Sequence, residues 1–475
     1  MKKTKHLLIG AMLISLSMPV TAQDNKAQID EIASIIKSNP ADLAKQMKDF
    51  YKKNKKNPEV LCGIGRAYYD LKDTLNAKVY ADYALKANDQ YSPAYILLGD
   101  LAARANNGGE AARNYEMAIY ADPKNPDAYI KYANVYRKVS PQGAVDKLEE
   151  LRSQRPDIAV DALKGRIYYS SNEFEKAIES FRKADINAME EADLTSFAMS
   201  LWFSQKYDES LKVVQAGLKK NPRDAAYNRL AFFNCTDLKD YDNALIYADA
   251  LFNKSDSAKF SYFDYTYYGN ALSGAKKHTE AIDMYKKALE QNFEDKTKRA
   301  GVIKQLSEGY KQNDDYENAI NTYQEFLNAV ETPQANDIVG LAQLYTQYAN
   351  TLEGDARKDM FKKAESTYAG LKEKFPDAEE YSIFWVARIN SYMDPETTEG
   401  LAKPYYEQLA AIIEPRAEKS SSDKARLIEC YRYLGYFNLV KDDRDAADVY
   451  WNKILELDPE NEIAKQALSI SNKKK

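Results

Sequence analysis

The sequence predicts an all-α solenoid built from about eleven helix pairs, and three observations support this prediction. The chain of 475 residues contains only 18 glycines and 15 prolines, too few turn residues for a fold of many short strands. Short phrases such as Tyr241-Asp-Asn-Ala-Leu245 and Tyr316-Glu-Asn-Ala-Ile320 recur along the chain. Apolar residues around these phrases are spaced three and four apart, which is the period of one helix face.

The first 22 residues have the composition of a secretory signal peptide. Three of the first five residues are lysine, residues 7–19 are mostly apolar, and small residues lead up to Ala22. The apolar run is shorter than the roughly 20 residues that a membrane-spanning helix needs, and polar residues follow it at once. We therefore expect cleavage after Ala22 and a mature chain without a transmembrane anchor. The expected location is the bacterial periplasm, with secretion as the second choice.

A helix pair at residues 23–57 is predicted to precede the repeats. The repeats are located by a small residue near the start of each second helix, at intervals of 33 to 37 residues up to Ala281 and of 38 to 45 residues beyond it. These small residues are Ala77, Ala111, Ala144, Ala177, Ser210, Ala244, Ala281, Ala319, Ala364, Ala402 and Ala447. The spacing indicates a regular array at 58–329 and an irregular array at 337–461. Residues 462–475 are predicted as a cap helix with a lysine-rich tail.

A second small residue occurs in the first helix of several pairs. It is found at Gly65, Gly99, Ala133, Gly165, Ala198, Gly269 and Gly435. Small residues at both positions allow the two helices of a pair to approach closely, and the large residues nearby fill the space between pairs. Because one pair cannot bury its apolar face alone, the pairs are expected to stack.

The last repeat shows the pattern most completely, since Leu434 and Gly435 are followed by Ala447, Trp451 and Pro459. This order resembles the tetratricopeptide repeat, in which a Leu-Gly pair precedes an alanine, an aromatic residue and a proline. The resemblance covers most of residues 58–461. It implies a right-handed superhelix whose first helices line a concave groove, and a role in protein–protein interaction.

By this resemblance, surplus apolar and arginine side chains on the first helices of the middle repeats are candidates for partner binding in the groove. They are Arg166, Tyr169, Met199, Trp202, Phe203, Arg229 and Phe233. Aromatic residues, methionine and arginine are enriched in the cores of protein interfaces. The alternative, that the rings pack inside the solenoid or against a neighbouring second helix, stays open.

Few residues suited to catalysis follow residue 22. The only histidine there is His278, predicted to lie in the turn between two helices, so a two-histidine metal site cannot form and a His-based triad is not expected. Cys62, Cys235 and Cys430 are predicted to be buried apolar residues and not disulfide partners. We expect no enzyme activity, no cofactor and no metal site.

The formal net charge of -5 and the isoelectric point near 5.6 do not suit a nucleic-acid-binding protein. The function expected from the repeats is that of a non-catalytic scaffold of the bacterial cell envelope, which binds a partner polypeptide in the concave groove. The alternative is a glycan-binding component of a sugar-uptake system, because exposed tyrosine and tryptophan rings suit sugar faces. Nothing in the sequence indicates the oligomeric state.

Overall fold

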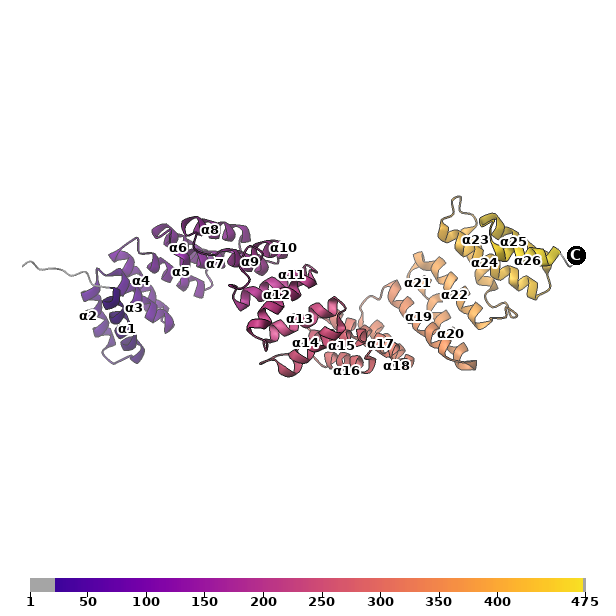
Figure 1. Ribbon diagram of the computed structural model, residues 1–475, viewed down its shortest axis with the longest axis horizontal. Coiled ribbons are helices and arrows are strands. Elements are labelled where there is room, and N and C mark those ends of the chain that lie inside the picture. Colours follow the sequence, from indigo (N-terminus) through magenta and orange to yellow (C-terminus); the bar gives the residue numbers. More distant parts are fainter. Residues whose placement is uncertain (1–21, 473–475) are drawn as a thin grey trace, which may run out of the picture. The chain divides into compact units, whose positions relative to one another are not determined.

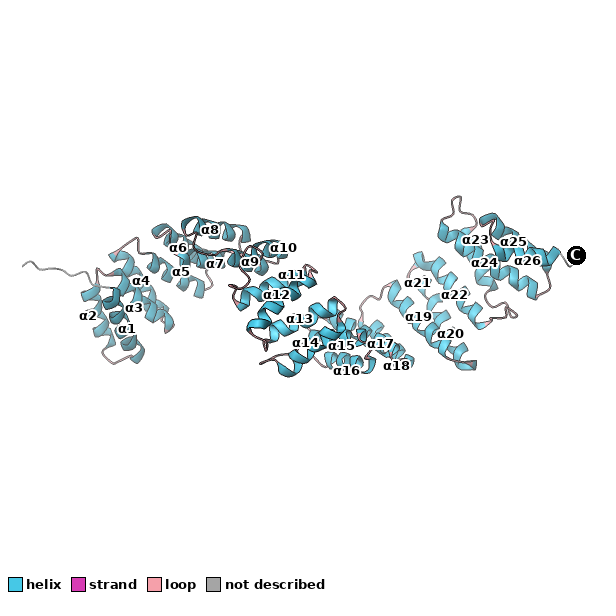
Figure 2. Ribbon diagram, viewed as in Figure 1, coloured by secondary structure: helices cyan, strands magenta, loops and turns pink. Residues whose placement is uncertain are grey.

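The computed structural model describes residues 22–472, and every regular element in that range is a helix (Figures 1 and 2). The predicted signal peptide lies outside the described residues apart from Ala22, as do the three terminal lysines. Within the described range, no helix has the length and the apolar character needed to cross a membrane.

The predicted succession of helix pairs is confirmed. The N-terminal pair is α1 (Ala22–Ser38) and α2 (Leu43–Asn54), and the helix after the last pair is α26 (Glu462–Asn472). Between them, eleven pairs follow one another along the chain: α3 (Pro58–Asp70) and α4 (Thr74–Ala87), α5 (Ser92–Arg104) and α6 (Gly108–Ala121), α7 (Pro126–Tyr136) and α8 (Pro141–Gln154), α9 (Asp161–Ser170) and α10 (Phe174–Phe181), α11 (Glu191–Phe203) and α12 (Tyr207–Lys220), α13 (Ala225–Asp237) and α14 (Tyr241–Asp249), α15 (Tyr262–Gly274) and α16 (His278–Leu289), α17 (Lys296–Gln312) and α18 (Tyr316–Ala329), α19 (Ala335–Thr351) and α20 (Gly354–Ala369), α22 (Glu379–Met393) and α23 (Lys403–Ile413), α24 (Ser421–Val440) and α25 (Arg444–Leu457).

Short extra elements account for part of the irregular spacing. A π-helical turn (Ala250–Lys254) extends α14, and the short helix α21 (Leu371–Lys374) with a 3-10 turn (Pro376–Ala378) follows α20. These insertions lengthen the connections while the helix pairs on either side are kept. The loop between α18 and α19 covers residues 330–334, at the boundary between the two predicted arrays.

The chain forms two compact units, with the boundary after Asn234, inside α13. In the first unit, one apolar core includes the N-terminal pair and reaches Leu97 on α5. In the second unit, separate cores are centred on α17 to α20 and on α22 to α26. Cys62, Cys235 and Cys430 are free and buried, which confirms their prediction as core residues.

The small residues of the second helices make the close contacts that the sequence predicts. All eleven, from Ala77 to Ala447, have no exposed surface. Nine are the fourth residue of their helix, whereas Ala364 lies in the middle of α20 and Ala402 directly precedes α23. The register of the repeat is therefore kept except where the spacing is irregular.

Glycines in the first helices receive aromatic rings from the second helices. A Cβ atom at Gly165 would lie 2.7 Å from the ring of Phe181, and one at Gly435 would lie 2.7 Å from the indole of Trp451. Each ring stands four residues after the small residue of its own helix. The glycine of the first helix and the alanine and aromatic residue of the second helix thus take part in one contact. In this contact the aromatic ring lies directly on the backbone of the first helix.

In many pairs, the same short turn connects the first helix to the second. The residue before the N-cap of the second helix has a positive φ in eight pairs, at Lys72, Asn106, Asn172, Gln205, Lys239, Lys276, Asp314 and Asp442. The next residue caps the helix where it is Asp or Asn; for example, Asp315 accepts a hydrogen bond from the backbone N–H of Asn318. Such caps satisfy amide groups that have no partner within the helix.

Candidate functional site

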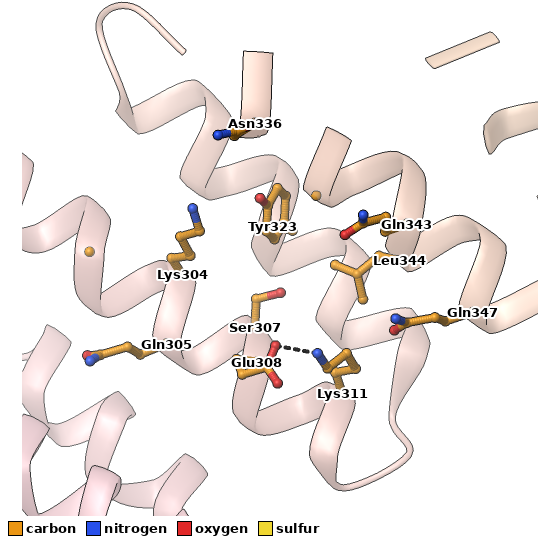
Figure 3. A pocket seen from close by; sticks show the side chains of 12 residues that line it. Lys304, Gln305, Ser307, Glu308, Lys311, Tyr323, Asn336, Gln343, Leu344 and Gln347 are labelled. Atoms are coloured by element: carbon orange, nitrogen blue, oxygen red, sulfur yellow. Dashed lines mark ion pairs between the residues drawn. The ribbon is translucent and has the colours of Figure 1, made fainter. Parts of the chain in front are cut away.

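A cavity of about 450 Å³ lies in the second unit between the first helices α17 and α19, with α18 behind them (Figure 3). It is lined by Gly301, Lys304, Gln305, Ser307, Glu308, Lys311, Tyr323, Asn336, Gly340, Gln343, Leu344 and Gln347. Most of these side chains are polar, and most come from the first helices.

Two glycines shape this cavity for different reasons. A Cβ atom at Gly340 would fall on the hydroxyl group of Tyr323, so only glycine lets this ring reach between the helices. Gly301 has no heavy atom within 4 Å of the position a Cβ atom would take, so this part of α17 presents open backbone surface.

A second cavity of about 330 Å³ continues the first across α17. It is lined by Tyr241, Asn270, Ser273, Gly274, Tyr285, Gln305, Glu308, Gly309 and Gln312. Because Gln305 and Glu308 line both cavities, the two adjoin. Together they form a groove across the first helices α15, α17 and α19, which we call the carboxamide groove.

The charged groups at the first cavity are paired. Lys304 lies 2.9 Å from Asp337, and Lys311 lies 2.6 Å from Glu308 (Figure 3). Burial, together with the carboxylates of Asp337 and Glu308, raises the pKa of Tyr323 to about 12. Its hydroxyl group is therefore a neutral hydrogen bond donor at physiological pH.

Four carboxamides in the first cavity make no hydrogen bond to any other described residue: Gln305, Asn336, Gln343 and Gln347. Other amides near the groove are engaged, since Asn270 accepts a hydrogen bond from Tyr285 and Gln312 donates one to Glu308. Each carboxamide offers two N–H donors and a carbonyl acceptor. The groove thus presents matched donors and acceptors with little unpaired charge.

The partner-binding residues predicted from sequence lie in the first unit, on α9, α11 and α13. Arg166 pairs with the buried carboxylate of Asp193, its Nε donating to Oδ1 at 2.8 Å. Met199 and Arg229 are half-buried. Because the guanidinium of Arg166 is held by an acid of the next pair, its charge is not free for a partner.

The predicted aromatic residues form a chain of ring contacts. Phe203 stacks on Phe174 at a centroid distance of 4.7 Å, and Tyr169 lies 6.2 Å from the same ring. Trp202 meets Phe203 edge-on at 5.2 Å and lies 6.3 Å from Phe233. The sequence prediction did not include Phe174, which joins Tyr169 to Phe203.

Burial separates these rings into two groups. Phe203 is 47% exposed, and Tyr169 and Trp202 are half-buried, so they reach the surface of the first unit. Phe233 is only 5% exposed, and its ring packs beside Phe232 and Trp202, so it offers a partner little surface. For Phe233 this burial favours the alternative, packing inside the solenoid.

The position of His278 also differs from its prediction. It is the first residue of α16 and is half-buried, not a turn residue. Among the residues described, no three His, Cys, Asp or Glu side chains are grouped so that they could hold a metal ion.

A model of the tetratricopeptide repeat family matches residues 162–185, which include most of α9 and all of α10. The match contains Gly165 and Ala177, the two small residues of that pair, and helix pairs of this kind recur along the chain. Residues 162–185 are thus a tetratricopeptide repeat, and the helix pairs before and after it have the same architecture.

Solved structures similar to this chain include the C-terminal part of a tetratricopeptide repeat-containing protein from Cytophaga hutchinsonii. That structure is 26% identical, with 58% of this chain and 99% of that one covered and a TM-score of 0.47. A tetratricopeptide repeat protein from Parabacteroides merdae is 18% identical over 53% of this chain and 98% of its own, with a TM-score of 0.35. YrrB, described as a repeat protein with an unusual peptide-binding site, is 17% identical over 50% of this chain and 97% of its own, with a TM-score of 0.27. No curated protein shows significant sequence similarity to this chain.

The carboxamide groove was not predicted from the sequence, although the sequence carries a signal for it. Gly301 stands four residues before Gln305, and Gly340 stands three before Gln343 and seven before Gln347. Each glycine therefore shares a helix face with glutamines on a first helix of the repeat. A search for glycine and amide residues at helical spacing would have found this face.

Proposed function

We propose that this tetratricopeptide-repeat protein is a non-catalytic interaction scaffold of the bacterial cell envelope, and that the carboxamide groove binds an extended segment of a partner polypeptide. The fold is typical of protein–protein interaction. The observation that carries the proposal is the set of four carboxamides in the groove without a hydrogen bond to another described residue.

The spacing of these amides suits an extended main chain. Gln343 and Gln347 are four residues apart on α19, which is a rise of about 6 Å along the helix. Two residues of an extended peptide span about 6.6 Å, so two peptide groups at that spacing in a chain lying along α19 would meet these two amides. Carboxamides can donate to its carbonyl groups and accept from its N–H groups.

The paired charges determine what kind of segment binds. Lys304 and Lys311 both have a carboxylate partner, so the first cavity offers no unpaired cation to an acidic ligand. Recognition therefore relies on main-chain hydrogen bonds, and affinity should change little with salt concentration. We infer that the preferred segment is extended and uncharged.

The envelope location is proposed on the composition of residues 1–22, where a basic start is followed by an apolar run and small residues. Mass spectrometry of the protein isolated from a periplasmic extract should show a chain that begins at Gln23. A chain that keeps residues 1–22 and stays in the cytoplasm would contradict this part of the proposal.

The binding proposal is tested with the mature chain and a random dodecapeptide library displayed on phage. Selected peptides should bind the wild type, and Gln343→Ala/Gln347→Ala should weaken that binding at least tenfold in fluorescence anisotropy. The control is Gln215→Ala/Gln466→Ala, two exposed glutamines outside both cavities, which should bind as the wild type does.

The outcomes separate the two candidate functions. Peptides that bind the groove variant and the wild type equally would place the site elsewhere. A library without enriched peptides, together with binding to a glycan array, would support the glycan-binding alternative.

A further inference from the structure

A separate cleft of about 650 Å³ lies in the first unit, far along the sequence from the carboxamide groove. Its walls are the second helices α4 and α6, and the C-terminal half of α5 forms its floor. It is lined by Thr74, Leu75, Lys78, Asp82, Leu98, Leu101, Ala102, Arg104, Ala105, Glu110, Arg113 and Asn114. We call it the second-helix cleft.

The floor and one wall of this cleft are apolar. Leu98 and Leu101 of α5 are half-buried and rest on the core of the first unit. Leu75 of α4 is 81% exposed, the largest exposed fraction among the large apolar residues that the structure describes. A leucine in this position has almost no contact to stabilise it, so its apolar surface is available to a partner.

The charges on the rim are not balanced. Lys78 pairs with Asp82 at 3.2 Å, and Glu110 accepts a hydrogen bond from Asn107. In the described part of the chain, neither Arg104 nor Arg113 pairs with a carboxylate. The rim therefore carries two guanidinium groups that can receive carboxylates from outside.

Arg104 is held ready for such a contact. Its guanidinium lies 3.6 Å from the centroid of the Tyr69 ring, and its Nη1 donates to the Tyr69 carbonyl at 2.5 Å. These contacts restrain a long side chain, so less rotamer entropy is lost when a ligand binds. Guanidinium groups also form two parallel hydrogen bonds to a carboxylate.

We propose that the second-helix cleft docks an acidic amphipathic helix of a partner protein. Apolar side chains of that helix pack on Leu75, Leu98 and Leu101, and its carboxylates meet Arg104 and Arg113. A helix is the occupant that we expect because the lining runs along three helices, α4, α5 and α6, and helices pack on one another at interaxial distances of about 8–10 Å. The lining of this cleft shares no residue with the carboxamide groove.

The probes for this proposal are two synthetic 18-residue helical peptides. One has leucine on a single helix face and glutamate elsewhere, and the other has lysine in place of each glutamate. The glutamate peptide should bind the mature chain in fluorescence anisotropy, more weakly at 300 mM than at 50 mM salt, whereas the lysine peptide should not bind. Leu75→Ser and Arg113→Glu should each weaken binding of the glutamate peptide at least tenfold.

Matched substitutions outside the cleft provide the control. Ile246→Ser changes another exposed apolar residue, and Lys86→Glu reverses a charge on α4 outside the lining, so both should bind as the wild type does. Circular dichroism checks that each variant is folded. Equal binding by Leu75→Ser and the wild type, equal binding of both peptides, or binding only to vesicles of anionic lipid would each overturn the proposal.

Discussion

Replacing Gly435 with alanine tests the contact on which the repeat depends. A Cβ atom there would lie 2.7 Å from Cε2 and Cζ2 of the Trp451 indole, and Trp451 has no exposed surface. Forcing an extra methyl group against a buried ring costs about 3 kcal/mol at the upper end of ordinary overpacking. The higher helix propensity of alanine offsets about 1 kcal/mol of that cost. The expected net effect is a loss of about 2 kcal/mol in the free energy of unfolding.

Gly301→Ala is the matched control, because Gly301 also lies in a first helix of the second unit but has no heavy atom within 4 Å of the Cβ position. It should gain about 1 kcal/mol from helix propensity alone. Urea unfolding followed by circular dichroism compares the two midpoints. Because a repeat array need not unfold in one step, hydrogen exchange of α24 and α25 locates the loss. A Gly435→Ala protein as stable as Gly301→Ala would refute the reasoning.

Three further predictions follow from single residues. Burial works to raise the pKa of Asp394, but backbone N–H groups of the loop after it outweigh burial and hold that pKa below its usual range. The stabilisation by the ionised carboxylate is present above the unfolded pKa near 4 and is lost as the pH falls through the lower folded value. Hydrogen exchange in residues 395–401 should therefore accelerate in acid, and Asp394→Asn should show the same acceleration at pH 7. Lys276 has a φ of +61°, a left-handed conformation that glycine adopts readily and a β-branched residue does not. Lys276→Gly should therefore raise the free energy of unfolding by about 0.5 kcal/mol, and Lys276→Val should lower it by about 1 kcal/mol. A thermal melt that ranks the two variants in the opposite order would contradict the turn geometry. Burial raises the pKa of Cys62 to about 11, and burial together with the nearby Asp240 raises the pKa of Cys235 to about 12. Neither thiol should therefore react with iodoacetamide at pH 8 until urea unfolds the chain. Rapid labelling of the native protein would contradict this prediction.

The sequence was sufficient to locate most of the helix pairs because the contact between them is local. Ala177 and Phe181 lie one helical turn apart, and the glycine that receives the ring, Gly165, is twelve residues before Ala177. Both the glycine and the ring that make this contact therefore lie within one short stretch of the chain. The predicted position of the small residue within its helix was less exact for Ala364, which lies in the middle of α20, and for Ala402, which directly precedes α23.

Burial of individual rings could not be predicted in the same way. Phe203 and Phe233 are both aromatic residues of first helices that the sequence predicts to face the groove. Phe203 is 47% exposed, whereas Phe233 is only 5% exposed. The difference depends on which side chains of neighbouring pairs cover each ring. Phe174, for example, comes from α10 and stacks on Phe203 from α11.

The sequence by itself determined the all-α class, the number of helix pairs and the small residues at their contacts, because helical period and side-chain size are properties of neighbouring residues. Only the tertiary structure decided which polar and apolar side chains meet across pairs. The glutamines of the carboxamide groove lie on α17 and α19, and the lining of the second-helix cleft comes from α4, α5 and α6. Such surfaces form between elements about one repeat apart in the chain, and their chemistry appears only when stacking brings those elements together.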